Sequence, residues 1–253
     1  MLFLHDYIKT FKEEDLPNRA ELADILDETK SIYDVFRDGN PVDSFEIFVE
    51  RYNWLGSLSN KKIYGIDSNL ARNLPGALMQ DWILNLVFQL CEPYPQIDVF
   101  TEVRVSFGRY PIWKSGRVAY ETPSEKSDIA IGYLTDASGT EFIRSVPKKP
   151  YYGITRNQSV LPLATVNTKI RVSQSEFFDW LGREQLMTKG NPHCLSVQVA
   201  LRKEMDMSIV DAAQARDKFF LLGSGTERTV VPDRSELTRF IHTFSEHLTE
   251  RMA

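Results

Sequence analysis

An aspartate and a lysine stand in two apolar segments, and their chemical types suit phosphodiester chemistry. Asp128 opens the first segment (127–134, SDIAIGYL), and Lys169 lies in the second (160–172, VLPLATVNTKIRV). Phosphodiester cleavage needs a divalent cation near the phosphoryl oxygens and a cation or base near the attacking water. Since Mg²⁺ prefers hard oxygen ligands, we expect it to bind the Asp128 carboxylate and the backbone carbonyl of Thr168.

The residues around Lys169 have the spacing that a shared site requires. Side chains alternate along a strand, so Asn167 and Lys169 project from the same face. In this position the lysine would orient or deprotonate the water, or stabilise the transition state. The pattern also occurs by chance in chains of this length, and the alternative interpretation of Lys169 is a solvent-exposed strand residue.

A longer stretch adds a resemblance to a known family. The runs DIAIG at 128–132, VLPLATVNTK at 160–169 and NPHCLSVQVA at 191–200 resemble the core of type II restriction endonucleases of the PD-(D/E)xK superfamily, in particular the BbvCI type. The resemblance covers residues 127–201. It implies an α/β restriction-endonuclease-like core, a Mg²⁺-dependent site-specific deoxyribonuclease activity on double-stranded DNA, Asp128 as the metal-binding aspartate, and Lys169 as the catalytic lysine.

The sequence departs from the family pattern at Asn167, where the family has Glu or Asp. Three interpretations remain open. The amide oxygen of Asn167 binds the metal without contributing charge; a carboxylate from the next helix, Glu176 or Glu184, replaces the missing one; or the protein has lost cleavage and kept DNA binding. Glu184 is our candidate catalytic carboxylate, and its alternative interpretation is an exposed helix charge beside Arg183.

The resemblance also implies an acidic residue before the first strand that contacts the metal shell through water. Asp81, on a helix expected at 76–91, is our candidate. Glu102, on the first expected strand, is the alternative. Each of them is also compatible with a surface position.

Basic and amide side chains gather in two regions that would contact DNA. Residues 144–171 contain several cations and no acidic residue, and further cations surround a hairpin expected near residue 116. Arginine pairs with guanine and Asn or Gln with adenine, whereas lysine usually contacts phosphate. The candidates are Arg104, Arg109, Lys114, Arg117, Arg144, Lys148, Lys149, Arg156, Asn157, Gln158 and Arg171. For any single residue, the alternative is a solvated turn.

Hydrophobic periodicity predicts two regions, a helical one at 1–75 and a core at 76–253 with a mixed sheet flanked by helices. Residues 135–159 read as a long loop, and 223–227 (GSGTE) as a tight turn. Expected helices are 13–38, 42–55, 76–91, 174–188, 208–216 and 233–251, and expected strands are 99–106, 116–121, 127–134, 160–171, 194–201 and 218–222.

Composition limits the possible classes of protein. The 253 residues are 42% hydrophobic and 26% charged, values that exclude a disordered chain. The net charge of −5 argues against a uniformly basic DNA-coating protein but allows a local basic cleft. Cys91 and Cys194 lie far apart without zinc-site spacing, so we expect two core thiols.

The sequence also predicts a location and an assembly. It contains no apolar run long enough to span a membrane and no signal peptide, so we expect a cytoplasmic protein that does not contact membranes. Cleavage of both DNA strands requires two active sites. We therefore expect a homodimer or a pairing with a second endonuclease subunit.

Overall fold

A computed structural model describes most of the chain after residue 39. The described residues are 40–59, 68–108, 110–121, 124–136, 151–152, 158–226 and 229–253. The helix predicted at 13–38 lies outside them.

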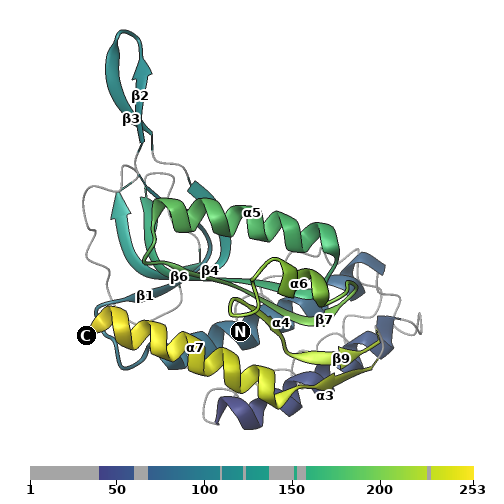
Figure 1. Cartoon of the computed structure of the whole chain (residues 1–253). Helices are drawn as coiled ribbons and strands as arrows, with labels where there is room; N and C mark the ends of the chain where they lie inside the picture. The colour runs from purple at the N-terminus through teal and green to yellow at the C-terminus, as the bar shows by residue number, and fades with distance from the viewer. Residues whose placement is uncertain are drawn as a thin grey trace, which may run out of the picture.

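A six-stranded mixed sheet forms the centre of the molecule, in the order β5-β1-β4-β6-β7-β8. β4 pairs antiparallel with β1 and β6, whereas β6, β7 and β8 run parallel to one another. Helices flank the sheet (Figure 1), so the predicted α/β architecture with a mixed sheet is confirmed. The strands are β1 (Asp98–Ser106), β4 (Ser124–Asp136), β5 (Tyr151–Tyr152), β6 (Gln158–Val172), β7 (Leu195–Lys203) and β8 (Phe219–Leu221).

The helices lie on opposite faces of this sheet. In Figure 1, α5 lies on one side and α3, α4 and α7 on the other. The loop between β7 and β8 contains the short helix α6. The helices are α3 (Pro41–Ser59), α4 (Ser68–Cys91), α5 (Gln174–Gly190), α6 (Ser208–Ala212) and α7 (Arg234–Met252).

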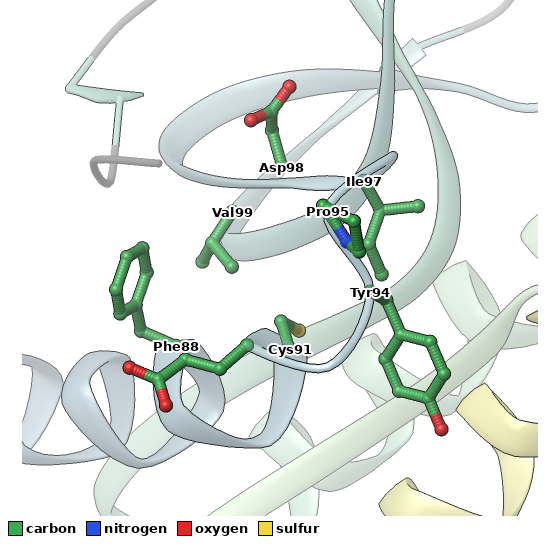
Figure 2. A pocket seen from close by; sticks show the side chains of 8 residues that line it. Phe88, Cys91, Tyr94, Pro95, Ile97, Asp98 and Val99 are labelled. Carbon is green, nitrogen blue, oxygen red and sulfur yellow. The ribbon is translucent and has the colours of Figure 1, made fainter. Parts of the chain in front are cut away.

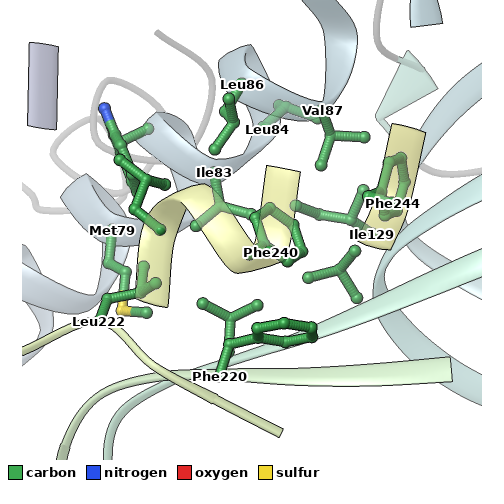
Figure 3. Close-up of a cluster of buried hydrophobic side chains, with 14 of the residues drawn as sticks. Met79, Ile83, Leu84, Leu86, Val87, Ile129, Phe220, Leu222, Phe240 and Phe244 are labelled. Carbon is green, nitrogen blue, oxygen red and sulfur yellow. The ribbon is translucent and has the colours of Figure 1, made fainter. Parts of the chain in front are cut away.

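The largest core fills the space between the sheet and the helices α3, α4 and α7. Figure 3 shows Ile83 of α4 and Phe240 of α7 meeting Ile129 and Phe220 of the sheet, and all four are fully buried. α7 contributes a stripe of apolar residues spaced three and four apart, as expected for a helix with one buried face. α4 is apolar on more than one face and is accordingly central.

Several sequence-based boundaries differ from the structure. Helix α4 begins at Ser68, so Pro75 lies inside it, and the helix crosses the boundary that we placed at residue 75. Phe45 and Phe48 of α3 also share the main core with sheet residues. The turn predicted at 223–227 is wrong in part, because Gly223–Gly225 forms strand β9 and pairs with β10 (Val230–Pro232).

Strand β1 changes its buried face in the middle. Val99 packs into the α4 side of the sheet, whereas Val103 and Val105 pack into a second core with Phe100. Glu102 lies between them with a φ of 52°, in the left-handed region that non-glycine residues rarely occupy. This backbone conformation breaks the simple alternation that the sequence predicts for the strand.

A two-stranded hairpin projects from the body of the protein (Figure 1). It consists of β2 (Tyr110–Lys114) and β3 (Arg117–Glu121), and we call it the arm. Ser115 and Gly116 form its turn with φ values of 52° and 77°. Positive φ at both central residues defines the turn type that best continues the twist of two paired strands.

Both cysteines are free and buried, as predicted. Burial raises the pKa of each thiol to about 12. Within the described ranges, none of the helices combines the length and apolar character needed to cross a bilayer.

Candidate active site

Asp128 occupies the point where β4 stops pairing with β6. The ladder between these strands ends at the pair Ile129 and Val166. Beyond it, Oδ2 of Asp128 accepts hydrogen bonds from the backbone N–H of Thr168 at 2.8 Å and from the Thr168 hydroxyl at 3.2 Å. The carboxylate thus takes the place of the next backbone partner of β6 and is held where the two strands diverge.

Thr168 therefore contacts Asp128 through its amide and hydroxyl. The N–H and C=O of one strand residue point to the same side of the strand. Because the Thr168 N–H points toward Asp128, its carbonyl faces this side too. The sequence predicted that this carbonyl would serve as a metal ligand. Its direction is compatible with that role, which stays a prediction.

The surroundings of Asp128 disfavour its charge. Burial raises the pKa of this carboxyl, and the nearby Glu102 carboxylate raises it further, although the Thr168 hydrogen bonds and Lys169 act in the opposite direction. Glu102 pairs with Lys126 and accepts a hydrogen bond from Gln80 at 3.5 Å. Two acidic side chains therefore meet here, which is an arrangement that a bound cation would stabilise.

We expect replacement of Asp128 by Asn to stabilise the free protein. A raised carboxyl pKa means that the folded state binds protons more tightly, so stability falls as pH rises through the folded-state pKa. Asparagine has no charge to bury and keeps an oxygen that can accept the Thr168 hydrogen bonds. The melting temperature of Asp128→Asn at pH 7 should exceed that of the wild type by a few degrees, and the difference should vanish in acid. A lower melting temperature at pH 7 would contradict this account.

Lys169 of β6 lies near the first turn of α5. It is exposed, and its positive charge acts on both Asp128 and Glu176. Glu176 and Ser173 form a capping box at the start of α5. Burial acts to raise the pKa of Glu176, but the Ser173 hydrogen bonds, Lys169 and Arg171 outweigh it and hold the pKa below its usual range. Glu176 is thus near the site, but its carboxylate is bound to the helix cap.

Glu184 is engaged elsewhere. Its Oε1 accepts hydrogen bonds from Lys218 Nζ at 2.6 Å and from the Thr188 hydroxyl at 2.8 Å, and its side chain is only 7% exposed. These contacts hold Glu184 beside Lys218, at the start of β8, and its role as a catalytic carboxylate stays a prediction.

Asp81 is 1% exposed on α4, which packs on the face of the sheet opposite α5. The preceding residue, Gln80, contacts Glu102. Glu102, the alternative acidic residue of the sequence prediction, acts on the pKa of Asp128. The predicted contact of Asp81 with the metal shell stays a prediction.

The predicted DNA-binding residues are spread over several elements. Arg104 is exposed on β1 opposite Lys126, and Arg171 is exposed but pairs with Glu204 at 3.0 Å. Arg117 is exposed at the tip of the arm, where Lys114 is its cross-strand partner. The remaining candidate with a described backbone is Gln158, at the start of β6. Candidates outside the described residues are Arg109, Arg144, Lys148, Lys149, Arg156 and Asn157.

The described residues contain no group of three or more His, Cys, Asp or Glu side chains that could hold a metal ion. A cavity of about 430 Å³ lies between the end of α4 and the start of β1 (Figure 2). Phe88 and Val99 line it, and Asp98 stands at its edge with a pKa that burial raises. None of the predicted site residues lines this cavity.

Sequence reasoning missed Gln198. This residue is 1% exposed in β7 and is paired in register with Asn167 of β6. Its amide nitrogen and oxygen are buried without a hydrogen-bond partner. The sequence did contain a signal, because a glutamine is unusual within an apolar run such as VQVAL, which is expected to form a buried strand.

Comparisons with known proteins give a distant structural likeness. No protein-family model and no curated protein matches the chain. Among solved structures, the chain is similar to one described as "native BbvCI A2B2 tetramer at low resolution", with 10% sequence identity and a TM-score of 0.36 over 94% of this chain and 98% of that chain. So low a TM-score does not establish a shared fold, and the PD-(D/E)xK core stays an expectation from the sequence.

Proposed function

We propose that this protein is a Mg²⁺-dependent, site-specific endonuclease that hydrolyses double-stranded DNA, of the type II restriction class. One observation carries the proposal. Asp128 and Lys169 lie where the central strands β4 and β6 stop pairing, and the positive charge of Lys169 acts on the Asp128 carboxylate. A carboxylate and an ammonium at one such point are the groups needed to hold a cation and a phosphate side by side.

The residues around Asp128 fit a magnesium ion. Mg²⁺ is commonly bound by one or two carboxylates, with water and substrate phosphate completing its shell. Asp128, Glu102 and the Thr168 carbonyl would supply three oxygens, and a cation would offset the repulsion that helps to raise the pKa of Asp128. Bound magnesium would neutralise phosphoryl oxygens and lower the pKa of a bound water.

The lysine has a separate part in the reaction. Its exposed ammonium can donate hydrogen bonds to a phosphoryl oxygen as negative charge develops there, or hold the attacking water in line. Thr168 keeps Asp128 fixed during this step, because its two hydrogen bonds orient the carboxylate. Two such sites are needed to cut both strands, which supports a homodimer or a second endonuclease subunit.

A second candidate is a noncatalytic DNA-binding or assembly subunit. The neutral amide at Asn167 and the engagement of Glu184 with Lys218 favour it, because neither residue then offers a free carboxylate at the site. This subunit would bind DNA without cutting it.

To distinguish the endonuclease from the noncatalytic subunit, the protein is incubated with plasmid DNA and Mg²⁺ or Mn²⁺. We expect linear or nicked products with the wild type, and none with EDTA or with Asp128→Ala. A gel shift at about 50 mM salt is run in parallel, since phosphate contacts dominate nonspecific affinity at low salt. Uncut DNA that still shifts would support the noncatalytic subunit, and neither cleavage nor a shift would overturn both functions.

The arm supplies a prediction about DNA binding. A two-stranded ribbon fits the major groove of B-DNA, and the Arg117 and Lys114 positions lie side by side at its tip. We expect Arg117→Ala to lower the slope of log affinity against log salt by about 1, because one phosphate contact is lost. Arg251→Ala, which removes an equally exposed cation from α7, should leave the slope unchanged. Equal slopes for both variants would exclude the arm from the interface.

A further inference from the structure

Asp128, Asn167 and Gln198 lie in one row across three neighbouring strands. Asn167 and Gln198 are paired in register, and Asp128 is one residue beyond the last pair of β4 and β6, opposite Asn167. Adjacent strands are about 4.8 Å apart, so each residue of the row is within reach of the next. The row leads from the partly exposed Asp128 to the fully buried Gln198.

The buried end of this row contains polar atoms without partners. Both amide atoms of Gln198 and the indole Nε1 of Trp180 are buried and make no hydrogen bond. Among the unsatisfied buried side-chain atoms of the described residues, Gln198 Oε1 is the sole acceptor. Native proteins leave few such groups unpaired, and an ordered water or a functional role usually accounts for them.

The rise of α5 along β6 places Trp180 level with this row. Glu176 of α5 is level with Lys169, and Met187 Sδ accepts a hydrogen bond from the Thr165 hydroxyl, so α5 runs antiparallel to β6. The helix rises about 6 Å from Glu176 to Trp180. The strand covers about 7 Å from Lys169 back to Asn167, so Trp180 and Asn167 are at the same level.

Contacts within a third buried cluster, between α5 and the sheet, agree with this placement. Trp180 belongs to the same buried cluster as Ala200 and Phe219. Ala200 is the next residue on the same face of β7 as Gln198, and Phe219 is paired with Gln198 across the sheet.

The direction of hydrogen bonding in the row follows from donor chemistry. An indole N–H can only donate, and Gln198 Oε1 is an unsatisfied acceptor among the described residues, but the two atoms are not hydrogen-bonded to each other. An ordered water that accepts from Trp180 and donates to Gln198 Oε1 would leave the Gln198 N–H groups to face Asn167. The Asn167 oxygen would then accept from them, and its own N–H groups would face Asp128 and Lys169.

We propose that Trp180, Gln198 and Asn167 form a one-directional hydrogen-bond row, closed by ordered water, that makes Asn167 a donor to a phosphoryl oxygen of DNA. This inference rests on the proposed function. It gives Asn167 a role in binding phosphate instead of the metal-binding role considered from the sequence. Asn167 binds the phosphate beside Lys169, and the metal belongs to Asp128 and Glu102. Gln198 and Trp180 are positioning residues, since they act through Asn167.

The test measures DNA affinity in EDTA at about 50 mM salt. Gln198→Met removes the amide that orients Asn167. It should weaken metal-free DNA binding about 10-fold, the scale of one hydrogen bond to a charged group. Trp180→Phe removes only the N–H and should weaken binding about 3-fold, because the Gln198 amide can then turn over. Ser196→Ala, on the same face of β7 and equally buried, is the matched control and should bind as the wild type does.

Two further readouts separate this role from others. The melting temperature of Gln198→Met should stay well above the assay temperature, which controls for folding. The Mg²⁺ concentration for half-maximal cleavage should also stay the same. Unchanged metal-free binding together with a raised Mg²⁺ requirement would show that the Asn167 oxygen binds metal, which overturns the inference.

The remaining outcomes also decide the matter. Equal metal-free binding by the wild type and both row variants overturns the inference and leaves the endonuclease proposal intact. If Gln198→Met does not fold, the Trp180→Phe result stands alone as the test. A wild type that binds no DNA, with or without Mg²⁺, overturns the proposed function, and the inference falls with it.

Discussion

Replacing Lys169 with Met should reduce DNA cleavage by at least about 10²-fold, because the ammonium that faces the scissile phosphate is lost. Methionine keeps the length of the side chain and removes its charge. Lys169 is exposed, so the free energy of unfolding should change by no more than about 0.5 kcal/mol. The measurement is the rate of plasmid cleavage at saturating Mg²⁺, with the melting temperature as the control for folding.

Lys169→Arg divides the two possible roles of the lysine. Arginine keeps the positive charge but does not lose its proton in proteins, so it cannot act as a base. Partial activity in this variant would indicate that Lys169 stabilises charge, whereas activity as low as in Lys169→Met would indicate proton transfer. Full activity of Lys169→Met would remove this residue from the mechanism and, with it, the observation that carries the proposed function.

Periodicity in the sequence was enough to predict most elements of the sheet and of the helices that flank it. The strands at 127–134, 160–171 and 194–201 are confirmed within a few residues, since apolar runs of this length have few alternatives. The alternation that places Asn167 and Lys169 on one face agrees with the effect of Lys169 on Glu176 at the start of α5. These features depend on neighbours along the chain, which a sequence displays directly.

Features that depend on distant neighbours were not predictable. The proximity of Glu102 to Asp128 requires the register of β1 against β4 and a left-handed backbone at Glu102, and no local pattern indicates either. The sequence suggested Glu184 as a catalytic carboxylate, but the lysine with which it pairs, Lys218, lies 34 residues away along the chain. The unpaired amide of Gln198 can be related to the site only when Asn167 is known to be its cross-strand neighbour.

The contact between Glu184 and Lys218 gives the second large effect, on stability. The Glu184 side chain is 7% exposed and that of Lys218 is 30% exposed. Lys218→Met leaves a buried carboxylate with the Thr188 hydroxyl as its remaining partner. Removing one partner of a buried ion pair is strongly destabilising, so we expect a loss of about 3 kcal/mol in the free energy of unfolding, measured by urea denaturation.

The double variant Glu184→Leu/Lys218→Met should recover most of this loss, because two apolar side chains replace both charges and no unpaired carboxylate remains. Cleavage by the double variant should equal that of the wild type if the pair is structural. The sequence-based role of Glu184 as a catalytic carboxylate predicts the opposite pattern, in which Glu184→Gln abolishes cleavage and barely alters the free energy of unfolding. That pattern would require Glu184 to leave Lys218 and turn to the metal when DNA binds. It would support the interpretation in which a carboxylate from the next helix replaces the charge that is missing at Asn167.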